Sequence, residues 1–270
     1  MLAAHTPEVA MKSFAHRYGP WAVVTGASSG IGEQFARQLA ARGLHLIVVA
    51  RRRARLDALA DELRRDHGVE AVSVVADLSA AEAVDSVVGA TTGRDVGLLV
   101  NGAGFALTGD LLHHPLDAHF KLLDVNTRAP LMLAHRLGPG LLSRGCGGVI
   151  NVASLAGFLP MPGWANYAAS KAYLLSLSEA LAYEWRARGV DVLALCPGAT
   201  ATEFANVAGI EHAGMAVEPV VAEALAALGR RDVVVTGGRN RLVAALTRLL
   251  PRRRRTAVGA KVVASMRPAA

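Results

Sequence analysis

Residues 21–32, WAVVTGASSGIG, are the stretch on which the fold prediction rests. Its first part is a short apolar run, which is typical of a buried strand. Three glycines follow, and after them a helical pattern runs to Gly43. In a doubly wound sheet, glycines at the first strand-to-helix turn let the backbone approach a pyrophosphate, and the helix N-terminus favours its negative charge. We therefore expect a dinucleotide here, the alternative being a purely structural turn.

The same alternation of apolar runs and helical patterns continues along the chain. Further strands are predicted at 45–50, 71–75, 98–100, 148–152, 190–195 and 233–235, and the longest helices at 116–137 and 166–188. Residues 79–82, Ser-Ala-Ala-Glu, have the pattern of a capping box and predict another helix start. Strands joined by helices over short connections indicate a parallel sheet covered on both faces. The prediction is an α/β fold with three layers, a Rossmann-type doubly wound parallel β-sheet in a single domain.

Composition and charge restrict the class of protein. The 270 residues fit one large domain, and 52% apolar against 19% charged residues excludes wholesale disorder. The net charge of +7 resides in residues 239–270, where nine Lys or Arg and no acid leave the rest of the chain at −2. Such a body gives no reason to expect nucleic acid as a partner. We divide the chain into an N-terminal extension (1–19), the main domain (20–238) and a basic amphipathic tail (239–270).

Two cysteines, Cys146 and Cys196, lie far apart and lack metal-ligand spacing, so neither a disulfide framework nor a metal site is expected. They favour a reducing compartment, and residues 1–19 lack the apolar core of a signal peptide. The uncharged run at 145–170 contains five glycines and two prolines, which argues against a membrane helix. A cytoplasmic location is the prediction.

A candidate for proton transfer lies at Tyr167 and Lys171. Four residues apart, they share one face of a helix. A free tyrosine titrates near ~10, so it acts at neutral pH only where a neighbouring cation favours the phenolate, and Lys171 is such a cation. The hydroxyl of Ser154 would hold the substrate oxygen whose proton Tyr167 gives or takes. This spacing also occurs by chance in many helices, so its meaning depends on a predicted hydride donor.

Further motifs follow one another along the chain. They are TGASSGIG at 25–32, Asp77, Asn-Gly-Ala-Gly at 101–104, Asn126, Ser154, Tyr167-xxx-Lys171 and Pro197-Gly198-xxx-Thr202. In this order they resemble the short-chain dehydrogenase/reductase family, and the resemblance extends from about Trp21 to Thr236. Gly102 stands where the family usually has a second asparagine, a position that mostly shapes the turn beside the cofactor.

The resemblance implies a role for each matching residue. Tyr167 would be the acid–base group, Lys171 would lower its pKa and bind the nicotinamide ribose, and Ser154 would orient the substrate carbonyl. Asn126 would hold a water that links Lys171 to solvent, its alternative being an ordinary buried polar residue.

The motifs that carry the resemblance, together with the arginines after the second predicted strand, give a set of predicted cofactor-binding residues. They are Gly26, Ser28, Ser29, Gly30, Ile31, Gly32, Arg51, Arg52, Asp77, Leu78, Asn101, Gly102, Ala103, Tyr167, Lys171, Pro197, Gly198, Thr200 and Thr202. Among them, Asp77 would bind near the adenine, Asn101 near the adenosine ribose and Thr202 near the nicotinamide amide. Taken alone, Asp77 has the alternative of a cap at a strand–loop–helix junction.

The residues after the second predicted strand indicate which dinucleotide binds. NAD sites usually carry an acid about 20 residues beyond the glycine turn, where it binds the ribose 2′-hydroxyl. Here the strand ends in Ala50-Arg51-Arg52-Arg53, and the first acid is Asp57. Guanidinium groups without a carboxylate suit a 2′-phosphate, so we predict NADP(H) rather than NAD, with Arg51 as the first candidate and Arg52 as the second. The alternative, a solvated helix start, is disfavoured for cations by the helix dipole.

Two segments, 155–164 and a loop at about 199–216, should line the substrate pocket, because ligands lie beyond the carboxyl ends of parallel strands. Neither offers an Arg or Lys to hold a carboxylate or phosphate, which favours an apolar carbonyl compound or its alcohol. The predicted pocket residues are Phe105, Phe158, Met161, Trp164 and Phe204. Ordinary loop packing is the alternative for these side chains.

The tail has two interpretations. Residues 241–250 have an amphipathic pattern and are followed by four arginines at 252–255. This suits docking on an anionic membrane surface or, as we favour, a subunit contact followed by a solvated basic end. The tail loosely resembles a branch of the family that includes long-chain ketoacyl and steroid reductases. The family itself implies a homodimer or homotetramer.

The predicted function is an NADP(H)-dependent oxidoreductase that interconverts a ketone or aldehyde and an alcohol by hydride transfer, with Tyr167 as the acid–base group. One alternative is a non-catalytic NADP-binding sensor or scaffold, which the acid–base pair disfavours because a sensor has no need of it. A second is a nucleotide-sugar epimerase, which the glycine spacing disfavours.

Overall fold

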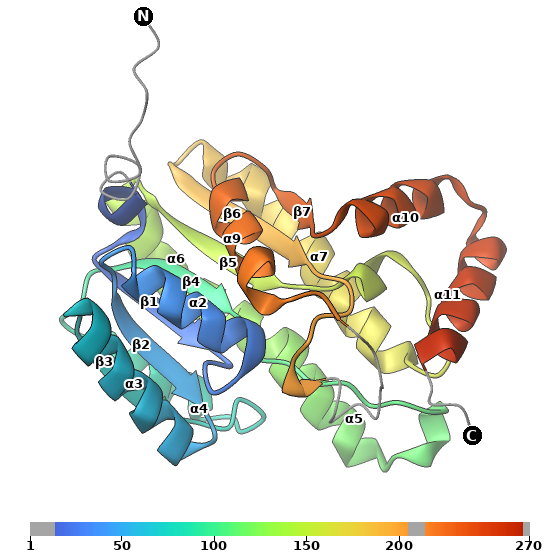
Figure 1. Ribbon diagram of the computed structural model, residues 1–270, viewed down its shortest axis with the longest axis horizontal. Coiled ribbons are helices and arrows are strands. Elements are labelled where there is room, and N and C mark those ends of the chain that lie inside the picture. The colour runs from blue at the N-terminus through green and yellow to red at the C-terminus, as the bar shows by residue number, and fades with distance from the viewer. Residues whose placement is uncertain (1–13, 205–213, 267–270) are drawn as a thin grey trace, which may run out of the picture.

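The computed structural model describes residues 14–204 and 214–266, whose strands form one parallel sheet in the order β3-β2-β1-β4-β5-β6-β7 (Figure 1). The strands are β1 (Trp21–Thr25), β2 (His45–Ala50), β3 (Ala71–Val75), β4 (Val96–Asn101), β5 (Gly147–Val152), β6 (Val190–Cys196) and β7 (Val233–Val235). The strand order reverses at β1 and β4, where ligands bind in such sheets. The predicted doubly wound sheet is confirmed.

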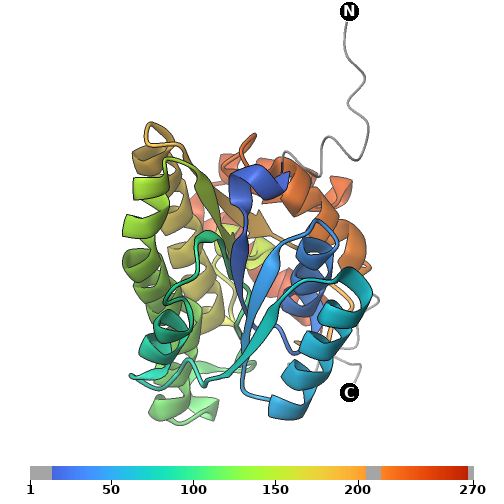
Figure 2. The same ribbon diagram turned by 90° about the vertical axis from the view of Figure 1, so that its left-hand side faces the viewer.

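Helices cover both faces of the sheet, as Figure 2 shows. One face carries α2 (Gly30–Ala40), α3 (Arg53–His67) and α9 (Val217–Ala227), and the other carries α4 (Ala83–Ala90), α6 (Ala129–Arg144) and α7 (Ala165–Arg186). Successive strand residues point to opposite faces of the sheet. Val24 therefore packs in the core beneath α2, α3 and α9, and Val23 in the core beneath α4, α6 and α7. Both cores are apolar, which explains why the strands appear as continuous apolar runs.

The helix predicted at 116–137 has different bounds in the structure. It consists of α5 (Leu116–Leu123), a π-helical segment at Asp124–Arg128, and α6, which continues to Arg144. The predicted end at 137 lies just before the glycines and the proline at 138–140. Gly138 instead packs against Trp185, whose Cη2 would lie 2.9 Å from a Cβ at that position. Tertiary packing therefore outweighs the hydrogen bond that Pro139 cannot donate.

The capping box predicted at 79–82 is wrong. Helix α4 begins at Ala83, and Glu82 precedes it without a side-chain cap. The amide and hydroxyl of Ser79 donate instead to Asp77 Oδ1, at 3.1 and 2.9 Å. This local turn competes with capping, as Asp and Ser side chains commonly do.

The structure describes only part of the predicted N-terminal extension, of the tail and of the substrate loop. Of the predicted extension, residues 14–18 are helical, and Tyr18 donates a 2.7 Å hydrogen bond to Asp191 of β6. Residues 1–13 and 267–270, and residues 205–213 of the predicted substrate loop, lie outside the described residues.

The segment from residue 238 onward folds as two helices, α10 (Gly238–Leu249) and α11 (Arg252–Met266). The second packs back against the domain: Val263 is buried, and a Cβ at Gly259 would lie only 2.0 Å from the carbonyl oxygen of Pro160. Helix α10 leaves Leu242, Leu246 and Leu249 exposed. Across 14–204 and 214–266, no helix combines the length and apolarity needed to cross a membrane.

Candidate active site

A cavity of about 830 Å³ lies at the carboxyl ends of the strands. Its walls come from the glycine turn after β1, the loops after β2, β3, β4, β5 and β6, the first turns of α7, and both C-terminal helices. Most of the residues predicted to bind cofactor or substrate line it, although they are spread over some 180 residues of sequence. One continuous space therefore joins the expected cofactor and substrate regions.

The glycine turn is built for close backbone approach. Gly26 and Gly30 have positive φ angles of 71° and 57°, which side chains other than glycine rarely adopt. A Cβ at Gly32 would lie 2.4 Å from the carbonyl oxygen of Gly26. The hydroxyl of Thr25 accepts hydrogen bonds from the amides of residues 102 and 103, at 3.1 and 3.2 Å, and so ties this turn to the loop after β4.

The N-terminus of α2 fits the phosphates of a dinucleotide. Ser29 precedes the helix in an extended conformation, and its side chain makes no capping hydrogen bond. The first amides of the helix therefore receive no cap from the Ser29 side chain, and the turn lines the cavity. An anion at this point would satisfy those donors and the helix dipole.

Tyr167 and Lys171 lie on the first turns of α7, as their spacing predicted, and both are buried. The ammonium group of Lys171 is 5.8 Å from the centre of the Tyr167 ring and donates a 2.7 Å hydrogen bond to the carbonyl oxygen of Val152. Ser154 follows β5, and its Oγ accepts a 3.1 Å hydrogen bond from the amide of Ala156. That bond uses only a lone pair of Ser154, so its hydroxyl proton remains able to donate, to Tyr167 as it does here or to a substrate oxygen.

Burial controls the protonation of this pair. It raises the pKa of Tyr167 to about 12, opposed by a hydrogen bond with Ser154. It lowers the pKa of Lys171 to about 8, opposed by Cys196. We expected Lys171 to lower the pKa of Tyr167. Without a bound cofactor, the desolvation of Tyr167 is the larger effect, and it raises that pKa. Tyr167 is held as the neutral phenol, the form that donates a proton.

Asn126 lies in the π-helical segment and is buried. Its Nδ2 donates to the carbonyl oxygen of Phe105 and to Ser170 Oγ, each at 3.0 Å, and its Oδ1 accepts from the Phe105 amide at 3.2 Å. A Cβ at Gly104 would lie 3.2 Å from Asn126 Oδ1 and 3.3 Å from Lys171 Nζ. Glycine therefore keeps open the space between these two groups, where the family resemblance places a water.

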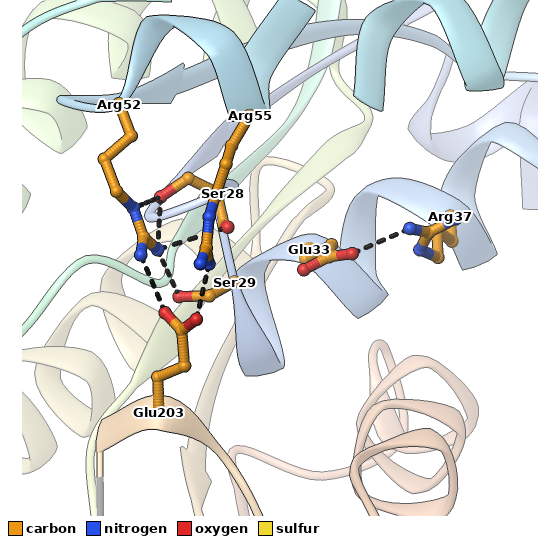
Figure 3. A network of polar contacts seen from close by, with 7 residues as sticks. All are labelled: Ser28, Ser29, Glu33, Arg37, Arg52, Arg55 and Glu203. Atoms are coloured by element: carbon orange, nitrogen blue, oxygen red, sulfur yellow. Dashed lines mark hydrogen bonds and ion pairs between the residues drawn. The ribbon is translucent and has the colours of Figure 1, made fainter. Parts of the chain in front are cut away.

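The arginines after β2 reach the edge of the cavity beside the glycine turn. Arg51 and Arg52 both line it. Arg52 donates to Ser28 Oγ at 3.0 Å and to Ser29 Oγ at 2.9 Å (Figure 3).

Asp77 also lines the cavity. Burial acts to raise its pKa, but the amide and hydroxyl of Ser79 hold the pKa below its usual value. Asp77 is therefore an ionised acceptor at neutral pH.

Asn101, predicted to bind near the adenosine ribose, is not among the residues that line the cavity. It pairs in the sheet with Asn151, and its Nδ2 donates to Asn151 Oδ1 at 2.8 Å, which in turn bonds Ser178 of α7. Asn101 Oδ1 is buried and has no partner among the described residues. Its side chain connects β4 to β5, and its contact with the adenosine ribose stays a prediction.

The half of the cavity that is expected to hold the substrate is apolar. Phe105, Met161, Trp164 and Phe204 line it as predicted. The rings of Trp164 and Phe204 lie 5.4 and 5.6 Å from that of Tyr167. Phe158 is a correction: it packs with Leu175, Ala194 and Cys196 and does not line the cavity. It ends the short 3₁₀ turn Leu155–Phe158, which directs it toward β6.

Sequence reasoning missed the residues that the last two helices contribute. Asn240, Val243, Val262, Ser265 and Met266 line the cavity. Val258, Val262 and Met266 pack on the cluster that contains Tyr167 and Trp164. Their four-residue spacing was a helical signal in the sequence. The run of arginines at 252–255 favoured a solvated end and concealed it.

The predicted cofactor residues that line the cavity are Gly26, Ser28, Ser29, Gly30, Ile31, Gly32, Arg51, Arg52, Asp77, Leu78, Gly102, Ala103, Tyr167, Lys171, Pro197, Gly198, Thr200 and Thr202. At residue 198, a Cβ would lie 2.4 Å from Asn240 Nδ2, so this glycine makes room for α10.

Comparisons with known proteins agree with this architecture. A family model described as short chain dehydrogenase matches residues 20–212. A 7beta-hydroxysteroid dehydrogenase of Collinsella aerofaciens is 33% identical over 233 residues, which cover 83% of this chain and 89% of that protein. The solved structure of a 7beta-hydroxysteroid dehydrogenase superposes with a TM-score of 0.86 at 29% identity, covering 91% of this chain and 98% of the other.

A further structural relative carries a bound cofactor. A short-chain dehydrogenase from Sphingobium yanoikuyae, solved in complex with NADPH, superposes with a TM-score of 0.77 at 33% identity, and the match covers 87% of this chain and 97% of the other. The match of fold, motif order and sequence spans most of the chain in each comparison. The chain therefore belongs to the short-chain dehydrogenase/reductase family of oxidoreductases.

Proposed function

We propose that the protein interconverts a bulky apolar ketone and its secondary alcohol with NADP(H). The observation that carries the proposal is the position of Tyr167. It lies where the glycine-turn half of the cavity meets the apolar half, with Ser154 and Lys171 beside it. The relatives named as hydroxysteroid dehydrogenases and the NADPH complex support the two halves of the proposal separately.

In a reduction, each residue of the site would have a separate role. The hydroxyls of Ser154 and Tyr167 would bind the carbonyl oxygen of the substrate, and Tyr167 would give its proton to that oxygen. The nicotinamide, when bound, supplies the hydride. Lys171 then offsets the negative charge left on Tyr167, and Asn126 holds the loop that contains Gly104 beside Lys171. The apolar walls keep water away from the reacting atoms.

The cofactor half of the proposal is tested at the arginines. Changing Arg51 and Arg52 together to serine should lower kcat/KM for NADPH by about 100-fold and that for NADH by less than about threefold, because charge-assisted hydrogen bonds to a 2′-phosphate are lost. Arg53→Ser is the control, since Arg53 is exposed and does not line the cavity. Equal losses with both cofactors would show that these arginines do not read the 2′-phosphate.

The substrate half is tested on α11. Changing Val262 to aspartate places a charge on the apolar wall, and we expect kcat/KM for a steroid ketone to fall at least about tenfold through KM. NADPH affinity and kcat/KM for cyclohexanone should change less than about threefold, because they do not use that wall. Ala264→Asp is the matched control, since Ala264 is exposed on the same helix. If both variants behave alike, α11 is not a wall of the substrate site.

A further inference from the structure

Glu203 is bound by two arginines at the start of α3, Arg52 and Arg55 (Figure 3). It lies in the segment after β6, next to Phe204. Its Oε2 accepts a hydrogen bond from Arg52 Nη1 at 2.8 Å, and its Oε1 accepts one from Arg55 Nη1 at 2.5 Å. Glu203 and Arg52 both line the cavity. A carboxylate therefore occupies part of the guanidinium fork that faces the cofactor region.

The remaining donors of Arg52 are directed at the glycine turn. They bond the hydroxyls of Ser28 and Ser29 and the carbonyl oxygen of Ser28. The arginine thus stands between the turn expected to hold the pyrophosphate and the carboxylate of Glu203. In the proposed function, this is the place of the 2′-phosphate of NADP(H). A phosphate and a carboxylate are alternative partners for one guanidinium fork, and their like charges repel each other.

The Glu203 ion pairs are easily exchanged. The side chains of Arg52 and Glu203 are 43% and 40% exposed, and such half-exposed pairs contribute little to stability. Both arginines hold the pKa of Glu203 down, to about 2, so the carboxylate is ionised at any pH at which the protein works. The competition between Glu203 and a phosphate is therefore one of charge and does not depend on pH near neutrality.

We propose that Glu203 sets the cofactor preference by competing with the 2′-phosphate for Arg52. This inference rests on the proposed NADP(H) specificity. NADP(H) binds by displacing the carboxylate from Arg52, whereas NAD(H) has no anion there and binds with the pair intact. Glu203 thus lowers the affinity for NADP(H) and narrows its advantage over NAD(H).

The test compares two probes that differ only in the phosphate, 2′,5′-ADP and 5′-AMP, by isothermal titration calorimetry. We expect Glu203→Gln to tighten the binding of 2′,5′-ADP by about three- to tenfold, the equivalent of one or two exposed ion pairs. The affinity for 5′-AMP should change by less than about twofold, and the gain should diminish in high salt. In steady-state kinetics, the ratio of KM for NADH to KM for NADPH should rise by the same factor.

The matched control is Glu223→Gln. Glu223 forms a 2.7 Å ion pair with Arg241 and does not line the cavity, so this variant removes one charge and one pair elsewhere. It should change neither probe. If Glu203→Gln leaves 2′,5′-ADP binding unchanged, or weakens either probe, while the wild type prefers 2′,5′-ADP, the inference about Glu203 is wrong and the cofactor proposal stands. If the wild type binds both probes equally, the NADP(H) proposal fails, and the inference with it.

Discussion

Replacing Tyr167 by phenylalanine should lower kcat for ketone reduction by about 10²- to 10⁴-fold, the contribution expected of a positioned general acid. The change removes one hydroxyl and keeps the ring that packs on Trp164 and Phe204. Affinity for NADPH and the folded structure should therefore be retained. Steady-state kinetics over a panel of ketones, together with NADPH fluorescence titration, measure both quantities.

The control for this variant is Tyr173→Phe. Tyr173 lies on the same helix but is 41% exposed, so its hydroxyl loss should leave kcat within about twofold, as surface changes away from the site do. If Tyr167→Phe keeps more than about a tenth of the wild-type kcat, another group transfers the proton. If neither form turns over any ketone while both bind NADPH tightly, the non-catalytic sensor becomes the better account.

The parts of the site that were predictable from the sequence are those whose geometry is local. The glycine turn needs only a strand, a helix and positive φ at Gly26 and Gly30. Tyr167 and Lys171 need only one helix. Such short-range constraints leave motifs that can be recognised, and the structure places these residues on one cavity as expected.

The parts that were not predictable depend on contacts between distant segments. Asn101 and Phe158 were expected in the cavity. The side chain of Asn101 instead forms a hydrogen bond to the neighbouring strand, and that of Phe158 packs in a separate apolar cluster. The pairing of Glu203 with Arg52 spans about 150 residues and leaves no local pattern. Helix α11 appeared as a basic end because its arginines dominate its composition, while the apolar residues at four-residue spacing decide where it packs.

The burial of Lys171, a residue proposed to act in catalysis, also makes the stability of the protein depend on pH. Burial lowers its pKa from 10.5 to about 8, so between these values the folded state has lost a proton that the unfolded state still binds. Stability conferred by this site therefore rises as the pH increases through that window and is lowest below about 8. Below that pH, the shift corresponds to a destabilisation of about 3–4 kcal/mol, at about 1.4 kcal/mol per pKa unit.

Changing Lys171 to methionine should therefore lower kcat by at least about 100-fold while raising the free energy of unfolding at pH 7 by about 1–2 kcal/mol, the gain being reduced because the Val152 carbonyl loses its partner. Urea unfolding at pH 7 and pH 9.5 measures the difference from wild type, which should shrink at the higher pH. Lys121→Met, at an exposed lysine, should show neither effect. A difference that stays constant with pH would mean that Lys171 is not desolvated as its burial implies, and that its charge is stabilised by a partner in the folded protein.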